Sequence, residues 1–72
     1  MAIHSHVDAG VEEIVRVLRG YRVLTRARLA DAVDAAEWPQ GMFEDALRRA
    51  VEQGRVRRLS DELLEIGPSE PQ

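Results

Sequence analysis

The sequence predicts a small, mainly α-helical domain that ends in a β-hairpin. Three stretches repeat apolar residues at the spacing of one helix face, and a fourth has two short apolar runs around a polar turn. With 72 residues and no cysteine, the chain has room for one domain that no disulfide can stabilise. We expect this domain over residues 6–66, between an N-terminal segment, 1–5, and a flexible C-terminal tail, 67–72.

The first helix is predicted over residues 6–19. One face of it carries the apolar residues Val7, Val11, Ile14, Val15 and Leu18. Ser5 and Asp8 have the spacing of a helix-start box, and Gly20 is expected to close the helix. Residues 21–24 are then expected to form a short extended segment.

The second helix is predicted over residues 26–35. Thr25 has a hydroxyl that can cap the start of this helix. Leu24 and Leu29 have the spacing of a hydrophobic staple across the same start. The buried side of the helix is expected to carry Leu29, Val33 and Ala36.

The third helix is predicted between Pro39 and Gly54. Proline suits the first position of a helix, and glycine suits the left-handed position just past its end. Its buried face is expected to carry five apolar residues at helical spacing, Phe43, Ala46, Leu47, Ala50 and Val51. Residues 55–59 and 63–66 flank a polar turn and are expected to form the two strands of the hairpin.

This order of elements resembles the winged helix-turn-helix family over about residues 11–66. Residues 24–30 look like the second helix of that family, residues 38–39 like the approach to its third helix, and residues 46–59 like its passage from helix to wing. The resemblance implies a three-helix winged helix-turn-helix fold. In that family the third helix usually enters the major groove of DNA, while the second helix and the wing contact the backbone.

Carried onto this chain, the resemblance implies a nucleic-acid-binding surface. Its residues are Arg26, Arg28, Gly41, Met42, Asp45, Arg48, Arg49, Arg55, Arg57 and Arg58. Arg48 or Arg49 would pair with a guanine, and Asp45 would accept from a cytosine amine. The arginines at the start of the second helix oppose its dipole, and a bound phosphate would relieve that repulsion. The expected function is a small DNA-binding protein, a transcriptional regulator that binds double-stranded DNA as a homodimer.

The charges leave a second function open, in which the winged helix is an adaptor or inhibitor that binds a protein and not DNA. The net charge is −3, and no predicted element is basic as a whole. In the third helix, Glu44 and Arg48 are four residues apart, as are Asp45 and Arg49, so each acid is expected to form an ion pair with its arginine. The turn of the hairpin carries Asp61 and Glu62, which would repel phosphates.

Two further features bear on this choice. Arg28 has the spacing to pair with Asp31 on the next turn, which would occupy that arginine. Trp38 is expected to pack as a lid over the joint between the second and third helices. If Trp38 and Met42 are both exposed, they would instead form a docking spot for a protein.

Neither an enzyme nor a metal or cofactor site is expected. The serines lie in the termini or a turn without a matched base and acid, and the chain has no glycine-rich phosphate loop. His4, His6 and Asp8 resemble the start of the metal motif of metallo-β-lactamase-like hydrolases, but the chain has no third histidine. Without an apolar run that spans a membrane or a signal peptide, a cytoplasmic location is expected.

Overall fold

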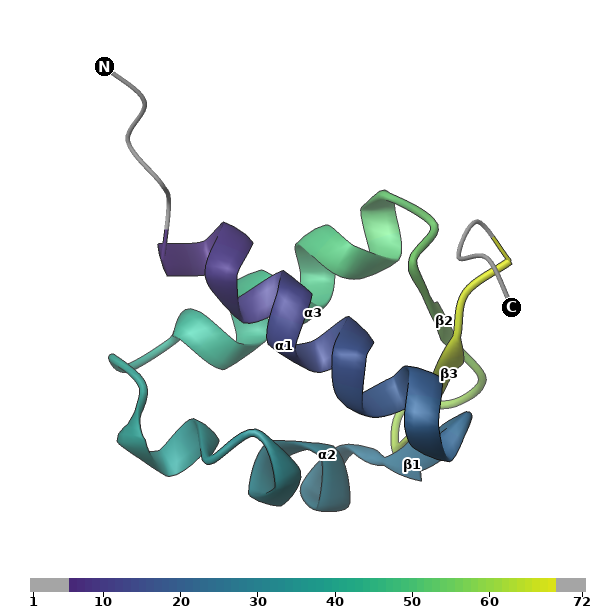
Figure 1. Cartoon of the computed structure of the whole chain (residues 1–72), viewed down its shortest axis with the longest axis horizontal. Coiled ribbons are helices and arrows are strands. Elements are labelled where there is room, and N and C mark those ends of the chain that lie inside the picture. The colour runs from purple at the N-terminus through teal and green to yellow at the C-terminus, as the bar shows by residue number, and fades with distance from the viewer. Residues whose placement is uncertain (1–5, 69–72) are drawn as a thin grey trace.

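The computed structural model, which describes residues 6–68, consists of three helices beside a small three-stranded antiparallel sheet (Figure 1). The helices are α1 (His6–Tyr21), α2 (Arg26–Ala32) and α3 (Met42–Glu52), and a 3-10 turn, η1 (Ala35–Glu37), follows α2. The strands are β1 (Val23–Thr25), β2 (Val56–Arg58) and β3 (Leu63–Ile66). The mainly helical class is therefore confirmed. Within the described residues, no helix has the length and apolar character needed to cross a membrane.

The core lies between the three helices and one face of the sheet. Its buried residues are Val11, Ile14, Val15, Leu18, Leu29, Val33, Ala46, Leu47, Ala50, Val56 and Leu64. The helix faces predicted from apolar spacing supply most of this cluster. Gly10 allows α1 and α3 to approach closely, because a β carbon there would lie 3.0 Å from the Cβ of Ala46 and 3.0 Å from the Cζ3 of Trp38.

The sheet has the strand order β1-β3-β2, so β3 is central and the other two strands are edges. Leu64 of β3 lies opposite Leu24 of β1 and opposite Arg58 of β2. The two strands of the hairpin were predicted, whereas β1 was expected only as an extended segment. Its pairing with β3 joins residues about forty positions apart, which local sequence patterns do not report.

The end of α1 differs from the prediction. The helix continues through Gly20 to Tyr21, and the left-handed residue beyond it is Arg22, with φ of 73°. The N–H of Arg22 donates to the Leu18 carbonyl at 2.6 Å, and its carbonyl accepts from the N–H of Ile66 at 2.8 Å. The pairing of this segment with β3 therefore sets where the helix stops. Ser5, the other half of the predicted start box, lies outside the described residues.

The start of α2 is as predicted and its end is not. The Thr25 side chain accepts from the N–H of Arg28 at 3.2 Å, which confirms the cap. The helix ends at Ala32, three residues early, because Asp34 takes a left-handed conformation with φ of 55° and the turn η1 follows. Ala36 is consequently exposed, and the neighbouring Ala35 packs against the core instead.

The start of α3 is also corrected, whereas its end is confirmed. Pro39 is not the first helical residue: Gly41 takes φ of 82° and α3 begins at Met42. A residue before proline favours extended backbone, and Trp38 is extended, so a turn is needed before the helix can start. At the other end, Gly54 is left-handed with φ of 75°, and the carbonyls of the last turn accept from Gly54 and Arg55 at 3.0 Å each.

Candidate interaction surface

Four of the seven arginines on the predicted DNA-binding surface are held in ion pairs within the chain. The pairs are Arg26–Glu44, Arg48–Asp45 at 3.2 Å, Arg49–Asp8 at 2.8 Å and Arg55–Glu12 at 2.6 Å. The two pairs predicted inside the third helix are therefore wrong. All four side chains do form ion pairs, but with other partners: Arg48 pairs with Asp45 inside α3, whereas Glu44 and Arg49 pair with residues of α2 and α1.

Two acidic residues of α1 neutralise arginines that follow them by more than forty positions. Asp8 and Glu12 lie one turn apart on the side of α1 that meets the end of α3 and the start of the hairpin. Arg55 donates to both oxygens of Glu12, at 2.6 and 3.3 Å, and its side chain is only 21% exposed. This pair is bidentate and half-buried, so Arg55 is poorly placed to reach a phosphate. Neither partner can be recognised from the sequence, because the spacing of charges reports pairs only within one element.

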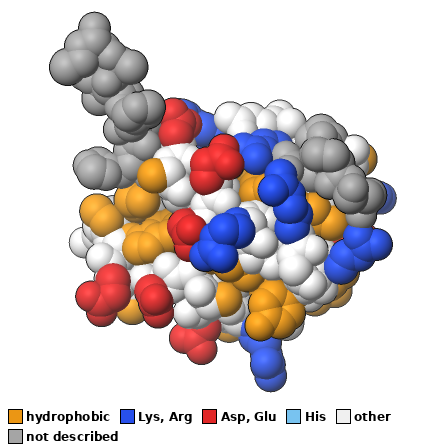
Figure 2. All heavy atoms as spheres, viewed as in Figure 1, with side chains coloured by type: hydrophobic (Ala, Val, Ile, Leu, Met, Phe, Trp, Pro, Cys, Tyr) orange, Lys and Arg blue, Asp and Glu red, His pale blue; other side chains and the backbone are white. Residues whose placement is uncertain are grey.

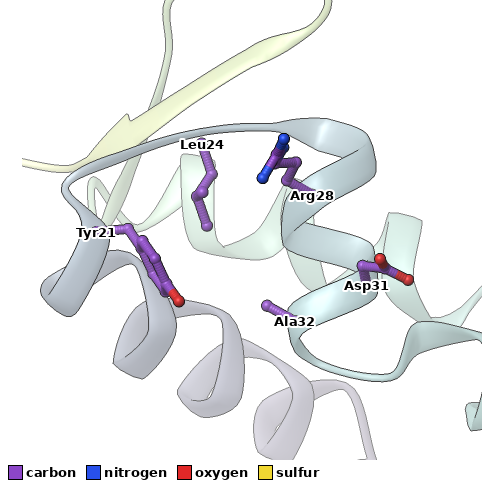
Figure 3. Close-up of a pocket in the computed structure, with 5 residues that line it drawn as sticks. All are labelled: Tyr21, Leu24, Arg28, Asp31 and Ala32. Carbon is purple, nitrogen blue, oxygen red and sulfur yellow. The ribbon is translucent and has the colours of Figure 1, made fainter.

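The two arginines at the start of α2 point in different directions. Arg26 turns toward α3, where it pairs with Glu44, and its guanidinium carbon lies 5.6 Å from the centre of the Phe43 ring. Arg28 instead lines a groove with Tyr21, which belongs to the end of α1 (Figure 3). The two guanidinium groups therefore do not form one phosphate-binding surface. Within the described residues Arg28 has no ion pair, so its predicted pairing with Asp31 is wrong; the two heads point apart in Figure 3.

The predicted recognition surface of α3 carries both acidic and basic residues, and one of its residues, Met42, is half-buried against α1. Gly41 lies in the turn before the helix, and Met42 is half-buried, with its Cε 3.4 Å from where a β carbon of Gly10 would lie. The first turn of α3 carries two exposed carboxylates, Glu44 and Asp45. A helix that reads bases with its first turns would bring these carboxylates toward the phosphates.

Trp38 is a packing residue and not an exposed platform. It is half-buried, and its ring lies 6.0 Å from that of Phe43 in a tilted arrangement. On its other side it lies against Gly10 of α1. Because Trp38 and Met42 are both half-buried, the condition for a docking spot at these two residues is not met.

The hairpin carries two exposed arginines of the predicted surface. Arg57 and Arg58 are exposed on β2, and neither has an ion pair among residues 6–68. Arg57 lies opposite Glu65 of β3 in the register of the sheet. The turn beyond them exposes Asp61 and Glu62, as predicted.

Acidic and basic side chains separate along α1 (Figure 2). On the face that Figure 2 shows, carboxylates lie near the N-terminal half of α1 and also along the lower-left edge of the molecule, whereas most guanidinium groups lie toward the sheet. Within α1 itself the charges are ordered, because Glu12 and Glu13 precede Arg16 and Arg19. Acids near the N-terminus and bases near the C-terminus both stabilise the helix through its dipole, so this segregation has a structural origin.

The Glu13–Arg16 pair predicts a small pH dependence. Hydrogen bonds from Arg16, at 2.8 and 3.0 Å, hold the pKa of the Glu13 carboxyl below its ordinary value, although partial burial acts in the opposite sense. A lowered folded-state pKa stabilises the fold above the ordinary pKa of glutamate, and this contribution is lost as pH falls through the lower value. It is small, because both side chains are about half exposed or more. An NMR titration of the Glu13 carboxyl should show a lowered midpoint that Arg16→Ala restores; equal midpoints in both proteins would contradict this.

The weak metal motif receives no support from the part of the chain that is described. His4 and the side chain of His6 lie outside it, and the Asp8 carboxylate binds Arg49. Between residues 6 and 68, no three histidine, cysteine, aspartate or glutamate side chains gather as a metal site would require.

Comparison with known proteins adds no family to this picture. No protein-family model matches the chain. Searches of the curated proteins and of the solved structures found no significant match either. The function must therefore be inferred from the contacts and charges of the chain itself.

Proposed function

We propose that this chain is a winged helix domain that binds a protein partner and not DNA. Three helices followed by a hairpin, with strand order β1-β3-β2, are compatible with the layout of a winged helix. One observation carries the choice of partner: four of the seven arginines expected to contact DNA are already paired with carboxylates of the same chain. A protein surface with its own mixed charges fits such a surface better than a polyanion does.

Duplex DNA binds proteins largely because free cations displace the counterions condensed on its phosphates. An arginine that already has a carboxylate partner must give up that partner before it can contribute. The other three arginines, which have no ion pair among residues 6–68, do not converge, since Arg28 faces the α1–α2 groove whereas Arg57 and Arg58 lie on β2. The acidic residues at the start of α3 and in the hairpin turn would lie among the DNA contacts and oppose them.

The free edge of β2 is the surface best suited to a protein partner. β2 is an edge strand, so the backbone groups on its outer side have no strand partner within the described residues. Arg57 and Arg58 are exposed on the same strand. An extended segment of a partner can add to such an edge through main-chain hydrogen bonds, and acidic side chains on it would pair with the two arginines. The proposed partner is therefore a protein with an extended, acidic segment.

A capture experiment with charge-reversed variants tests this function. The immobilised protein is exposed to nuclease-treated lysate and compared with the double variant Arg57→Glu/Arg58→Glu. We expect the wild type to retain a stoichiometric protein that the double variant loses. The control is Arg16→Glu/Arg19→Glu, which changes the charge equally on α1 and should retain that protein. Retention of no protein by the wild type, or an equal loss in both variants, would refute the proposal.

DNA binding by a transcriptional regulator is a second candidate, favoured by the exposure of Arg57 and Arg58, which have no carboxylate partner in the described part of the chain. Titration of a fluorescent DNA duplex at low salt separates the two functions. If the protein-partner proposal is correct, anisotropy should stay flat. Binding that weakens steadily with added salt, and weakens for all duplex sequences in Arg57→Ala, would instead establish DNA as the ligand.

A further inference from the structure

We infer that α2 and the end of α1 form a twofold interface with a second copy of this chain. The surface is a groove of about 290 Å³ lined by Tyr21, Leu24, Arg28, Asp31 and Ala32 (Figure 3). None of these residues lies on β2, so the inference does not depend on the function proposed above.

The charges of the groove are complementary to themselves. Arg28 and Asp31 stand three residues apart on α2, both exposed, and among residues 6–68 neither has an ion-pair partner. Their heads point apart along the helix in Figure 3. In a twofold contact the same patch of both subunits meets in reversed order. Two α2 helices that cross antiparallel would therefore set Arg28 against Asp31 of the partner subunit, and would do so twice.

The apolar part of the groove suits a helix that approaches closely. Tyr21 is 66% exposed and is the most exposed large apolar side chain in the described part of the chain. In the same groove, Ala32 is exposed on α2 and presents little bulk, while Leu24 forms part of the groove wall. A second copy would remove the aromatic ring from water and let the helices approach without steric conflict.

A second copy fits this groove better than an acidic or a basic partner. The groove carries one positive group, Arg28, and one negative group, Asp31. An acidic partner would be repelled by Asp31 and a basic partner by Arg28, whereas a second copy in reversed orientation would pair with both. The contact is small, because the groove is lined by five residues, whereas a stable interface takes about 20–30 residues from each partner. The dimer is therefore expected to dissociate in the micromolar range, where concentration-dependent measurements detect it.

Sedimentation equilibrium over a range of concentrations tests the interface with charge swaps. The wild type should show a monomer–dimer equilibrium. Arg28→Asp alone places two acids on α2 and Asp31→Arg alone places two bases there, so each variant should associate at least tenfold more weakly. An equimolar mixture of these two variants should form a heterodimer, and the double variant Arg28→Asp/Asp31→Arg should recover the wild-type constant.

Two controls keep the experiment decisive. Circular dichroism should show unchanged helix content in every variant, which separates lost association from lost folding. Arg16→Asp changes an exposed arginine of α1 outside the groove and should leave the association constant unchanged. A wild type that stays monomeric at the highest concentration, single variants that dimerise as the wild type does, or a mixture that stays monomeric would each overturn the inference.

Discussion

Replacing Gly67 with alanine is expected to lower the free energy of unfolding by about 3 kcal/mol, a large part of what so small a domain has. A β carbon at this position would lie 2.2 Å from the carbonyl oxygen of Gly54 and 2.5 Å from the carbonyl carbon of Arg55. Both atoms belong to the backbone of the turn after α3, which cannot move aside as a flexible side chain can. The N–H of Gly67 also donates to the Arg55 carbonyl at 2.8 Å, and this bond would be strained. Urea denaturation followed by circular dichroism measures the loss.

Gly20→Ala is the matched control for this glycine substitution. Nothing lies within 4 Å of a β carbon at Gly20, which is inside α1 and has no left-handed backbone. Alanine favours helix over glycine, so this variant should be more stable than the wild type by about 0.5 kcal/mol. If Gly67→Ala unfolds at the same urea concentration as Gly20→Ala, the close approach of β3 to the turn after α3 is not as described.

Leu47→Ala is expected to destabilise the domain by about 3 kcal/mol. Leu47 is 1% exposed and belongs to the buried cluster that includes Ile14 of α1 and Leu64 of β3. Its truncation removes apolar contacts and leaves a cavity that the neighbouring helices can fill only in part. The shift of the midpoint in urea, with an unchanged slope, measures the effect.

The control for Leu47 is Leu59→Ala, the same chemical change at the edge of the hairpin. Leu59 is 43% exposed, so its truncation should alter the free energy of unfolding by less than about 0.5 kcal/mol. Equal losses in the two leucine variants would show that the core does not lie where the helix faces meet. A full loss of folding in Leu47→Ala would still agree with the prediction, because the remaining stability is small.

The candidate interaction surface could be predicted only as a set of residues. The arginines and their elements followed from the sequence, but the direction of each side chain did not. Arg49 and Arg55 find carboxylates on α1 that precede them by 41 and 43 residues. A count of charges along each element cannot detect such pairs, because they depend on which helix faces pack together. The sequence shows that Asp8 and Glu12 lie one helical turn apart. Only the packing of α1 against α3 brings these carboxylates to Arg49 and Arg55.

The sequence by itself determined the features that depend on neighbours along the chain. Apolar spacing placed the buried faces of the helices, Thr25 capped α2, and Gly54 ended α3, because each acts within one or two helical turns. Only the tertiary structure decided that β1 is a strand, that Arg22 and not Gly20 takes the left-handed position, and that α3 begins after Pro39. The tertiary structure also decided which carboxylates neutralise Arg26, Arg49 and Arg55. These outcomes depend on contacts between residues far apart in the chain, whose geometry exists only after the helices and the sheet have packed together.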